Sequence, residues 1–141
     1  MHSASEDLVA RKHLSPQMPT RLFESQMAAA MCGLGAALSY QKLVKLELDI
    51  DLPKGETRSD WLQRPLSAAQ LEYAADDVLH LDALADRLGD RLEKMGRLDW
   101  LMQDGERQIA ASWLMPYGDN PHHDFRTAYK LSLDAQRRLC A

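Results

Sequence analysis

Apolar positions in the middle of the chain repeat at helical spacing. They recur three, four and seven residues apart and so share one side of a helix, at Leu71, Val78, Leu81, Leu84 and Leu88. This stripe predicts a long helix from about Ala68 to Met95, with Gly89 marking a bend or a break. Ser67 and Gln70 have the spacing of a capping box at its start, and Gly96 is expected to end it.

Shorter patterns predict the flanking elements. Ser3 or Ser5 is the expected cap of a first helix, which Pro16 stops. Residues 21–25 are short enough to be the end of a strand, and Trp61 with Leu62 predicts a short helical turn. Three further helices are expected, at Gln26 to Cys32, from the Ser39 cap to about Leu48, and at Leu98 to Leu114.

Polar stretches divide these elements. Residues 49–59 form a charged connection, and residues 116–121 contain two prolines, a glycine and an asparagine, which is typical of a linker. A new apolar pattern begins at Phe125 and runs to the last residue. The pattern therefore predicts one helical region followed by a linker and the start of a second unit.

Composition narrows the function classes. The 141 residues are 45% hydrophobic and 27% charged, which is ordinary for a globular domain, and the formal net charge of −4 argues against holding nucleic acid by charge alone. The sequence has no apolar run long enough to span a membrane, and its first residues do not resemble a signal peptide, so neither a membrane span nor a signal peptide is expected. Cys32 and Cys140 are isolated thiols, so neither a metal-ligand pair nor a disulfide framework is expected, and a reducing cytoplasm fits best.

Candidate chemistry concentrates on the central helix. Tyr73 and Asp77 are four residues apart, so a helix sets them one turn apart on one face, where a phenol and a carboxylate can hold a metal ion and position a water. A polar helix face is the commoner explanation for such a pair. Asp7 likewise suits the positive end of a helix dipole.

Three cations precede this helix. Lys54, Arg58 and Arg64 could reach phosphates, although a charged loop is usually just solvated.

Several motifs together resemble the ribonuclease D family. The run from His2 to Leu8 resembles the second exonuclease motif, and Gln70 to Val78 resembles the third motif, Tyr-x-x-x-Asp. Residues 54–67 look like the segment that precedes the third motif, and Phe23 to Gln26 is similar to a segment that usually reads Phe-Asp-Thr-Gln. The resemblance covers roughly residues 1–95.

The resemblance implies a 3′–5′ exoribonuclease of the DEDD class, tyrosine subtype, with a ribonuclease-H-like α/β fold. This chain would be a predominantly α-helical, C-terminal portion of that fold. Family members hold two divalent ions, Mg²⁺ or Mn²⁺, with four acidic residues, and act on RNA 3′ ends such as those of transfer RNA precursors. Asp77 matches the acid of the ion that activates water, Tyr73 the tyrosine that orients the water, and Asp7 an acid of the other ion.

The resemblance also implies a missing part. The first motif, Asp-x-Glu, should lie well upstream of Asp7, but the sequence starts at Met1. We therefore expect Met1 to be an internal methionine of a longer reading frame, and an upstream DNA sequence without an Asp-x-Glu segment would refute this. With two of four acids, we expect weak or no turnover by the chain alone.

The expected domain organisation has three parts. Residues 1–96 would be the C-terminal part of the exonuclease domain, and residues 97–121 a helix and linker. Residues 122–141 would start a truncated helicase-and-RNase-D C-terminal domain, because residues 128–136 are similar to its opening. Two alternatives remain open: a non-catalytic helical fragment that binds nucleic acid or a partner, and a degraded gene product. The sequence carries no indication of oligomeric state.

Overall fold

The described part of the chain is helical. The computed structural model describes residues 1–15, 17–53, 55–56 and 59–114, and within these it contains helices but no strand. The predominantly helical character is thus confirmed for these residues, whereas the predicted unit at residues 122–141 lies outside them. None of the described helices has the length and apolar content needed to cross a membrane. The helices are α1 (Ser5–Leu14), α2 (Ser25–Met31), α3 (Tyr40–Leu48), α4 (Ala68–Leu79), α5 (Leu81–Lys94) and α6 (Leu98–Leu114).

Most predicted helix ends are confirmed. Ser39 accepts a hydrogen bond from the backbone N–H of Lys42 at the start of α3, and Ser67 with Gln70 forms the expected capping box of α4. Gly33 and Gly96 end α2 and α5 with φ values of 78° and 66°. Such left-handed conformations favour glycine, because a side chain there would crowd the backbone.

The start of the chain differs from the prediction. The N-cap of α1 is Ala4, which has no side chain that can cap, so neither Ser3 nor Ser5 caps the helix. Instead, the N–H of Ser3 donates to the carboxylate of Glu24, 2.6 Å away. This carboxylate also accepts from the first N–H groups of α2, so Glu24 joins the beginnings of two helices.

Residues 21–25 are not a strand end. Ser25 already belongs to α2, and residues 21–24 form an extended connection. Met1 nevertheless pairs with this connection: its α-ammonium donates to the carbonyl of Phe23 at 3.0 Å, and its carbonyl accepts from the N–H of Ser25 at 2.9 Å. These two bonds have the pattern of a single parallel β-bridge.

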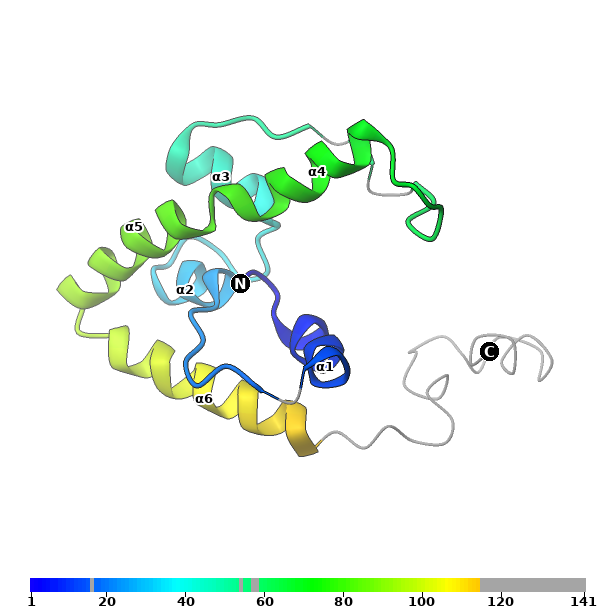
Figure 1. The fold of residues 1–141 in the computed structure, drawn as a ribbon. Coiled ribbons are helices and arrows are strands. Elements are labelled where there is room, and N and C mark those ends of the chain that lie inside the picture. Colours follow the sequence, from blue (N-terminus) through cyan, green and yellow to red (C-terminus); the bar gives the residue numbers. More distant parts are fainter. Residues whose placement is uncertain (16, 54, 57–58, 115–141) are drawn as a thin grey trace, which may run out of the picture.

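The long central helix is in fact two helices. Figure 1 shows α4 and α5 as separate helices. The break is at His80 and not at Gly89, which lies inside α5. The Tyr40 hydroxyl accepts from the N–H of His80 at 3.2 Å and donates to the carbonyl of Asp76 at 3.1 Å. An uninterrupted helix would join these two backbone groups directly, so a side chain inserted between them explains the break.

Two apolar clusters hold the helices together. The larger one is centred on α5, which packs against α2 and α3 and buries Leu84, Leu88 and Leu92 completely. The smaller one joins α1 to α6 through Ala4, Leu8 and Leu22, with Ile109 packed against them. In Figure 1, α6 runs below α5 and reaches α1 at its C-terminal end.

The predicted stripe is only half buried. Leu71 and Val78 on α4 are 57% and 60% exposed, whereas the stripe residues on α5 enter the core. α4 therefore extends beyond the core that α5 anchors, and it presents most of its surface to solvent.

Candidate functional site

Tyr73 and Asp77 lie on α4, as predicted. The start of this helix is held by Gln70, which is buried and whose side-chain amide donates to Ser59 Oγ at 3.2 Å and to the carbonyl of Asp60 at 2.9 Å. The capping box therefore does more than begin the helix. It also fastens the preceding loop to the first turn, just ahead of Tyr73.

Tyr73 is half-buried against an aromatic neighbour. The ring of Trp61 lies 5.9 Å from the ring of Tyr73, centroid to centroid, with the planes tilted by 53°. Trp61 is itself held by a hydrogen bond from its indole N–H to the carbonyl of Glu56, 3.1 Å away. The turn that the sequence predicts at Trp61 thus restricts the orientation of the tyrosine ring.

Asp77 is exposed, but its environment disfavours its charge. Partial desolvation raises the pKa of its carboxyl group, and the neighbouring carboxylate of Asp76 raises it further. A cation beside Asp77 would relieve this repulsion. Asp7 lies in the first turn of α1, where it is exposed and suits the positive end of the helix dipole.

Of the three predicted phosphate-binding cations, only Arg64 is among the described residues. Lys54 and Arg58 lie outside the described residues. Arg64 is exposed, and its Nη1 donates to the carbonyls of Trp61 and Gln63, both at 2.8 Å. The guanidinium group therefore braces its own loop and keeps an exposed face toward solvent.

The described residues do not assemble a complete metal centre. Tyr73 and Asp77 share a helix, whereas Asp7 belongs to α1, which lies apart from α4 (Figure 1). Among the described residues, no three His, Cys, Asp or Glu side chains come close enough together to hold a metal ion. Two carboxylates are suitable donors for a hard divalent cation, but they fall short of the ligands that a pair of ions requires.

Sequence reasoning missed a group of buried and half-buried residues that contact one another near the start of α3. His2 Nε2 donates to the carbonyl of Leu38 at 3.0 Å, while Nδ1 lies 2.9 Å from Ser25 Oγ. The edge of the His2 ring also meets Tyr40, with the centroids 5.7 Å apart. His2 and Ser25 lie in segments that the motif comparison singles out, whereas no sequence pattern marks Tyr40.

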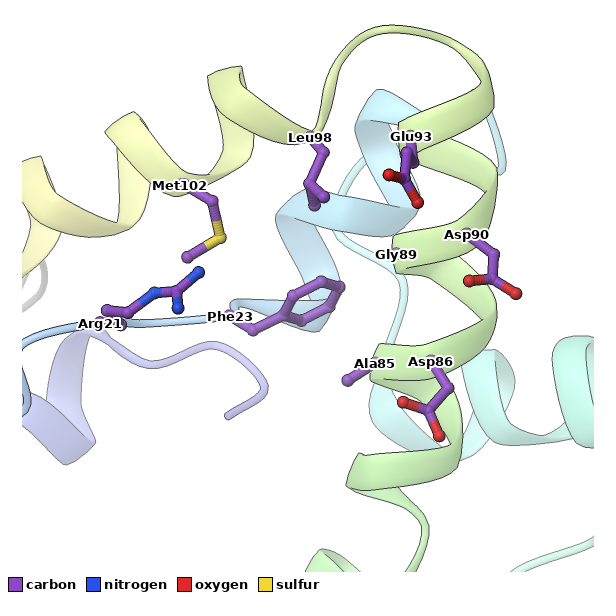
Figure 2. Close-up of a pocket in the computed structure, with 9 residues that line it drawn as sticks. All are labelled: Arg21, Phe23, Ala85, Asp86, Gly89, Asp90, Glu93, Leu98 and Met102. Atoms are coloured by element: carbon purple, nitrogen blue, oxygen red, sulfur yellow. The ribbon is translucent and has the colours of Figure 1, made fainter.

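A cavity lies elsewhere on the described part of the chain. Figure 2 shows a pocket of about 570 Å³ bordered by α5, the start of α6 and the extended connection. Phe23, Leu98 and Met102 form its apolar part, and three carboxylates of α5 stand on its other side. None of the predicted site residues that the structure describes lines it, so it is separate from the site on α4.

Comparison with known proteins places the chain in a family. A family model described as 3′–5′ exonuclease matches residues 1–93. A ribonuclease D of Xanthomonas oryzae pv. oryzae is 51% identical over 99% of this chain, and one of Shewanella sp. is 44% identical over 94%. The chain spans only 38% and 34% of the lengths of these two relatives.

Solved structures agree with this placement. Escherichia coli RNase D, described as an exoribonuclease involved in structured RNA processing, matches with a TM-score of 0.78 and 29% identity, covering 98% of this chain and 39% of that one. Brucella melitensis NrnC matches with a TM-score of 0.74 and 31% identity over 81% of this chain and 56% of that one, and it has been solved with bound Mg²⁺ and with pGG. This chain therefore belongs to the ribonuclease D family of 3′–5′ exonucleases.

Proposed function

We propose that this chain is part of a 3′–5′ exoribonuclease that removes nucleotides from RNA 3′ ends, and that α4 supplies the catalytic tyrosine. The observation that carries this proposal is the pairing of Tyr73 and Asp77 one turn apart on α4, inside the segment that the exonuclease family model matches. Transfer RNA precursors or other structured RNA 3′ ends are the proposed substrates, and the printed description of the Escherichia coli neighbour supports this class. The proposed location of the protein to which this chain belongs is the cytoplasm.

The proposed domain arrangement follows from the family. Residues 1–96 are the C-terminal part of a ribonuclease-H-like α/β exonuclease domain. The helix and linker of residues 97–121 connect this part to residues 122–141, the start of a helicase-and-RNase-D C-terminal domain. The match of residues 1–93 to the exonuclease model supports the first boundary.

The proposed cofactors are two divalent cations, Mg²⁺ or Mn²⁺. When bound, such ions stabilise the attacking and leaving oxygens of phosphodiester hydrolysis. Asp7 and Asp77 are the proposed ligands from this chain, and hard carboxylate oxygens suit both ions. The bound Mg²⁺ of the Brucella melitensis neighbour supports this choice of ion.

The remaining residues act on water and RNA. The Tyr73 hydroxyl makes a hydrogen bond with the attacking water, as donor or acceptor. Trp61 limits the positions that the tyrosine ring can occupy. Lys54, Arg58 and Arg64 contact the phosphates of the RNA. Because the chain contributes only two of the four family acids, its own turnover is weak or absent.

The test measures the release of mononucleotides from a 3′-labelled RNA with Mg²⁺ or Mn²⁺. We expect at most trace release, which Tyr73→Phe and Asp77→Asn abolish. In parallel, Mn²⁺ should broaden the NMR signals of the α4 amides around Asp77, because Mn²⁺ is paramagnetic, and Asp77→Asn should remove this broadening. Mononucleotide release that neither substitution affects would refute the assignment of Tyr73 and Asp77 to the site. Robust release that both substitutions abolish would refute the prediction that the chain alone has weak or no activity.

A non-catalytic role is the second candidate. The exposed apolar side chains of Leu71 and Val78 favour a helical fragment that binds a partner, and the exposed Arg64 favours one that binds nucleic acid. Salt-dependent RNA binding without a divalent ion, together with no Mn²⁺ broadening at Asp77, would support this role over the exonuclease.

A further inference from the structure

We propose that Tyr40 is a positioning residue for the site on α4. Its hydroxyl holds α4 at a defined angle to α5 and thereby sets where Tyr73 and Asp77 stand relative to the rest of the molecule. This inference rests on the proposed function of Tyr73 and Asp77.

The first argument is the position of the hydroxyl group. It lies between the carbonyl of Asp76 and the N–H of His80, at 3.1 and 3.2 Å. Asp76 immediately precedes Asp77, so one of the two bonds fixes the backbone next to the proposed metal ligand. The other fixes the junction residue between α4 and α5, whose φ and ψ of −103° and 4° are not helical.

The second argument is the rigidity of the element that carries Tyr40. Tyr40 is the first residue of α3, directly after the Ser39 cap, and only 9% of it is exposed. α3 packs against α5 through the larger apolar cluster. The buried carboxylate of Glu47 and Arg91 also join the two helices through an ion pair of 3.0 Å. The hydroxyl therefore projects from a fixed support.

The third argument is that most of α4 is exposed to solvent. The structure describes every residue of this helix, and Gln70, in its first turn, is the one that is buried. Gln70 and Tyr40 thus hold opposite ends of the helix. Without the Tyr40 hydroxyl, the C-terminal end that bears Asp77 loses a major restraint.

Tyr40 also contacts the segment that leads to the other proposed ligand. The His2 and Tyr40 rings make an edge-to-face contact, and His2 is hydrogen-bonded to the carbonyl of Leu38. His2 lies shortly before α1, whose first turn carries Asp7. Tyr40 therefore lies between the two segments that carry Asp7 and Asp77, and it links their positions.

The test compares Tyr40→Phe with Val44→Ala in the 141-residue chain. Tyr40→Phe removes the hydroxyl and keeps the ring against His2. Val44 lies one turn further along α3 and is fully buried in the same cluster, so Val44→Ala loosens the core without touching the α4–α5 junction. The measurements are the melting temperature, amide hydrogen exchange at His80, the α4–α5 angle from residual dipolar couplings, and the Mn²⁺ concentration that half-broadens the Asp77 amide.

In Tyr40→Phe we expect about tenfold faster exchange at His80, the order of magnitude of one lost hydrogen bond, together with a changed α4–α5 angle and a several-fold higher Mn²⁺ midpoint. Val44→Ala should lower the melting temperature while leaving the angle and the midpoint unchanged. An unchanged angle in Tyr40→Phe, or equal changes in both variants, would overturn the proposal.

Failure of the proposed function would look different. If Mn²⁺ broadens no α4 amide in the unsubstituted chain, the proposed metal site is refuted. The α4–α5 angle then still decides whether Tyr40 orients α4: a change confined to Tyr40→Phe supports the positioning role of Tyr40, and no change refutes it.

Discussion

Glu24 has a carboxylate that is almost completely buried, with only 4% of the residue exposed. Its Oε1 accepts from the N–H groups of Ser3 and Gln26 at 2.6 and 3.0 Å, and its Oε2 accepts from the N–H of Met27 at 2.6 Å. The charge is thus compensated by three donors and by the N-terminal end of α2.

Removing this side chain should be costly. We expect Glu24→Ala to lower the free energy of unfolding by about 2–4 kcal/mol, because three backbone donors lose a charged acceptor. Glu24→Gln, which keeps the size of the side chain and one acceptor oxygen, should lose less. Urea denaturation of both variants checks this, and a loss below about 0.5 kcal/mol in Glu24→Ala would contradict it.

Residues with local partners were predictable, and residues with distant partners were not. The side chains of Ser39 and Ser67 reach N–H groups three residues ahead, so spacing alone predicts them. The partners of Tyr40 are 36 and 40 residues away. Such a contact exists only after α3 and α4 have been brought together, and no local pattern contains it.

At the scale of elements, two helical glycines have opposite environments. A Cβ added to Gly89 in α5 would lie 3.8 Å from the ring of Phe23, which is an ordinary contact. A Cβ added to Gly105 in α6 would collide with the carbonyl oxygen of Leu22 and lie 3.2 Å from its Cβ. Gly105 thus permits the close approach of α6 to the extended connection, whereas Gly89 is merely tolerated.

Alanine at the two positions should therefore act in opposite directions. Gly89→Ala should raise the free energy of unfolding by about 0.5–1 kcal/mol, since alanine favours the helix, while Gly105→Ala should lower it by about 1–3 kcal/mol, because α6 must move away. Thermal or urea melts of the pair test this. Destabilisation by Gly89→Ala would contradict this and show that the contact with Phe23 does not tolerate a methyl group.

The helical pattern predicted the elements better than it predicted their burial. Periodicity identified α4 and α5 together, since no proline or glycine stands at His80 to mark the break. It also placed Leu71 and Val78 on the same apolar stripe as the α5 leucines, but burial depends on what covers a helix face. Within the described residues, that cover exists for α5 and is largely lacking for α4.

At the scale of the whole molecule, stability should be uneven. Among the described residues, the cluster between α1 and α6 has three buried members, whereas the cluster around α5 has nine. Regions with less buried apolar surface open at lower free energy. Asp7 lies on α1, which packs through the smaller cluster. Asp77 lies on α4, which extends from the larger cluster around α5.

Native-state hydrogen exchange tests this difference. Amides of α1 should exchange through a partial opening that needs less free energy than the opening of α5. Leu8→Ala should lower the opening free energy of the α1 amides by about 2–4 kcal/mol and that of the α5 amides by less. Equal opening free energies for α1 and α5 in the unsubstituted chain would show instead that the helices unfold as one unit.

The proposed site was predictable as a set of residues but not as an arrangement. Motif spacing brought Tyr73 and Asp77 onto one helix face, as the structure shows. The position of Asp7 relative to them depends on how α1 reaches α4 through His2, Tyr40 and the core. These tertiary contacts involve residues that the motifs either mark for other reasons or leave unmarked.

The bridge made by Met1 has a practical consequence when the 141-residue chain is produced by itself, so that Met1 carries a free α-ammonium. Its α-ammonium is half-buried where it bonds to Phe23, and burial lowers its pKa below the ordinary value. A base whose pKa is lower in the folded protein weakens stability as the pH falls through that pKa. An amide N–H could make the same bond to Phe23 without ever becoming charged.

A chain carrying two extra glycines before Met1 should therefore be more stable than the unextended chain at about pH 6 and equally stable at about pH 9, where the unfolded ammonium has also lost its proton. A cavity of about 280 Å³ beside Met1 offers room for the added residues. Urea melts of the two chains at both pH values check this. When the 141-residue chain is expressed alone, the residues placed before Met1 are then themselves a stability variable, and tagged and untagged preparations will differ in their acid tolerance.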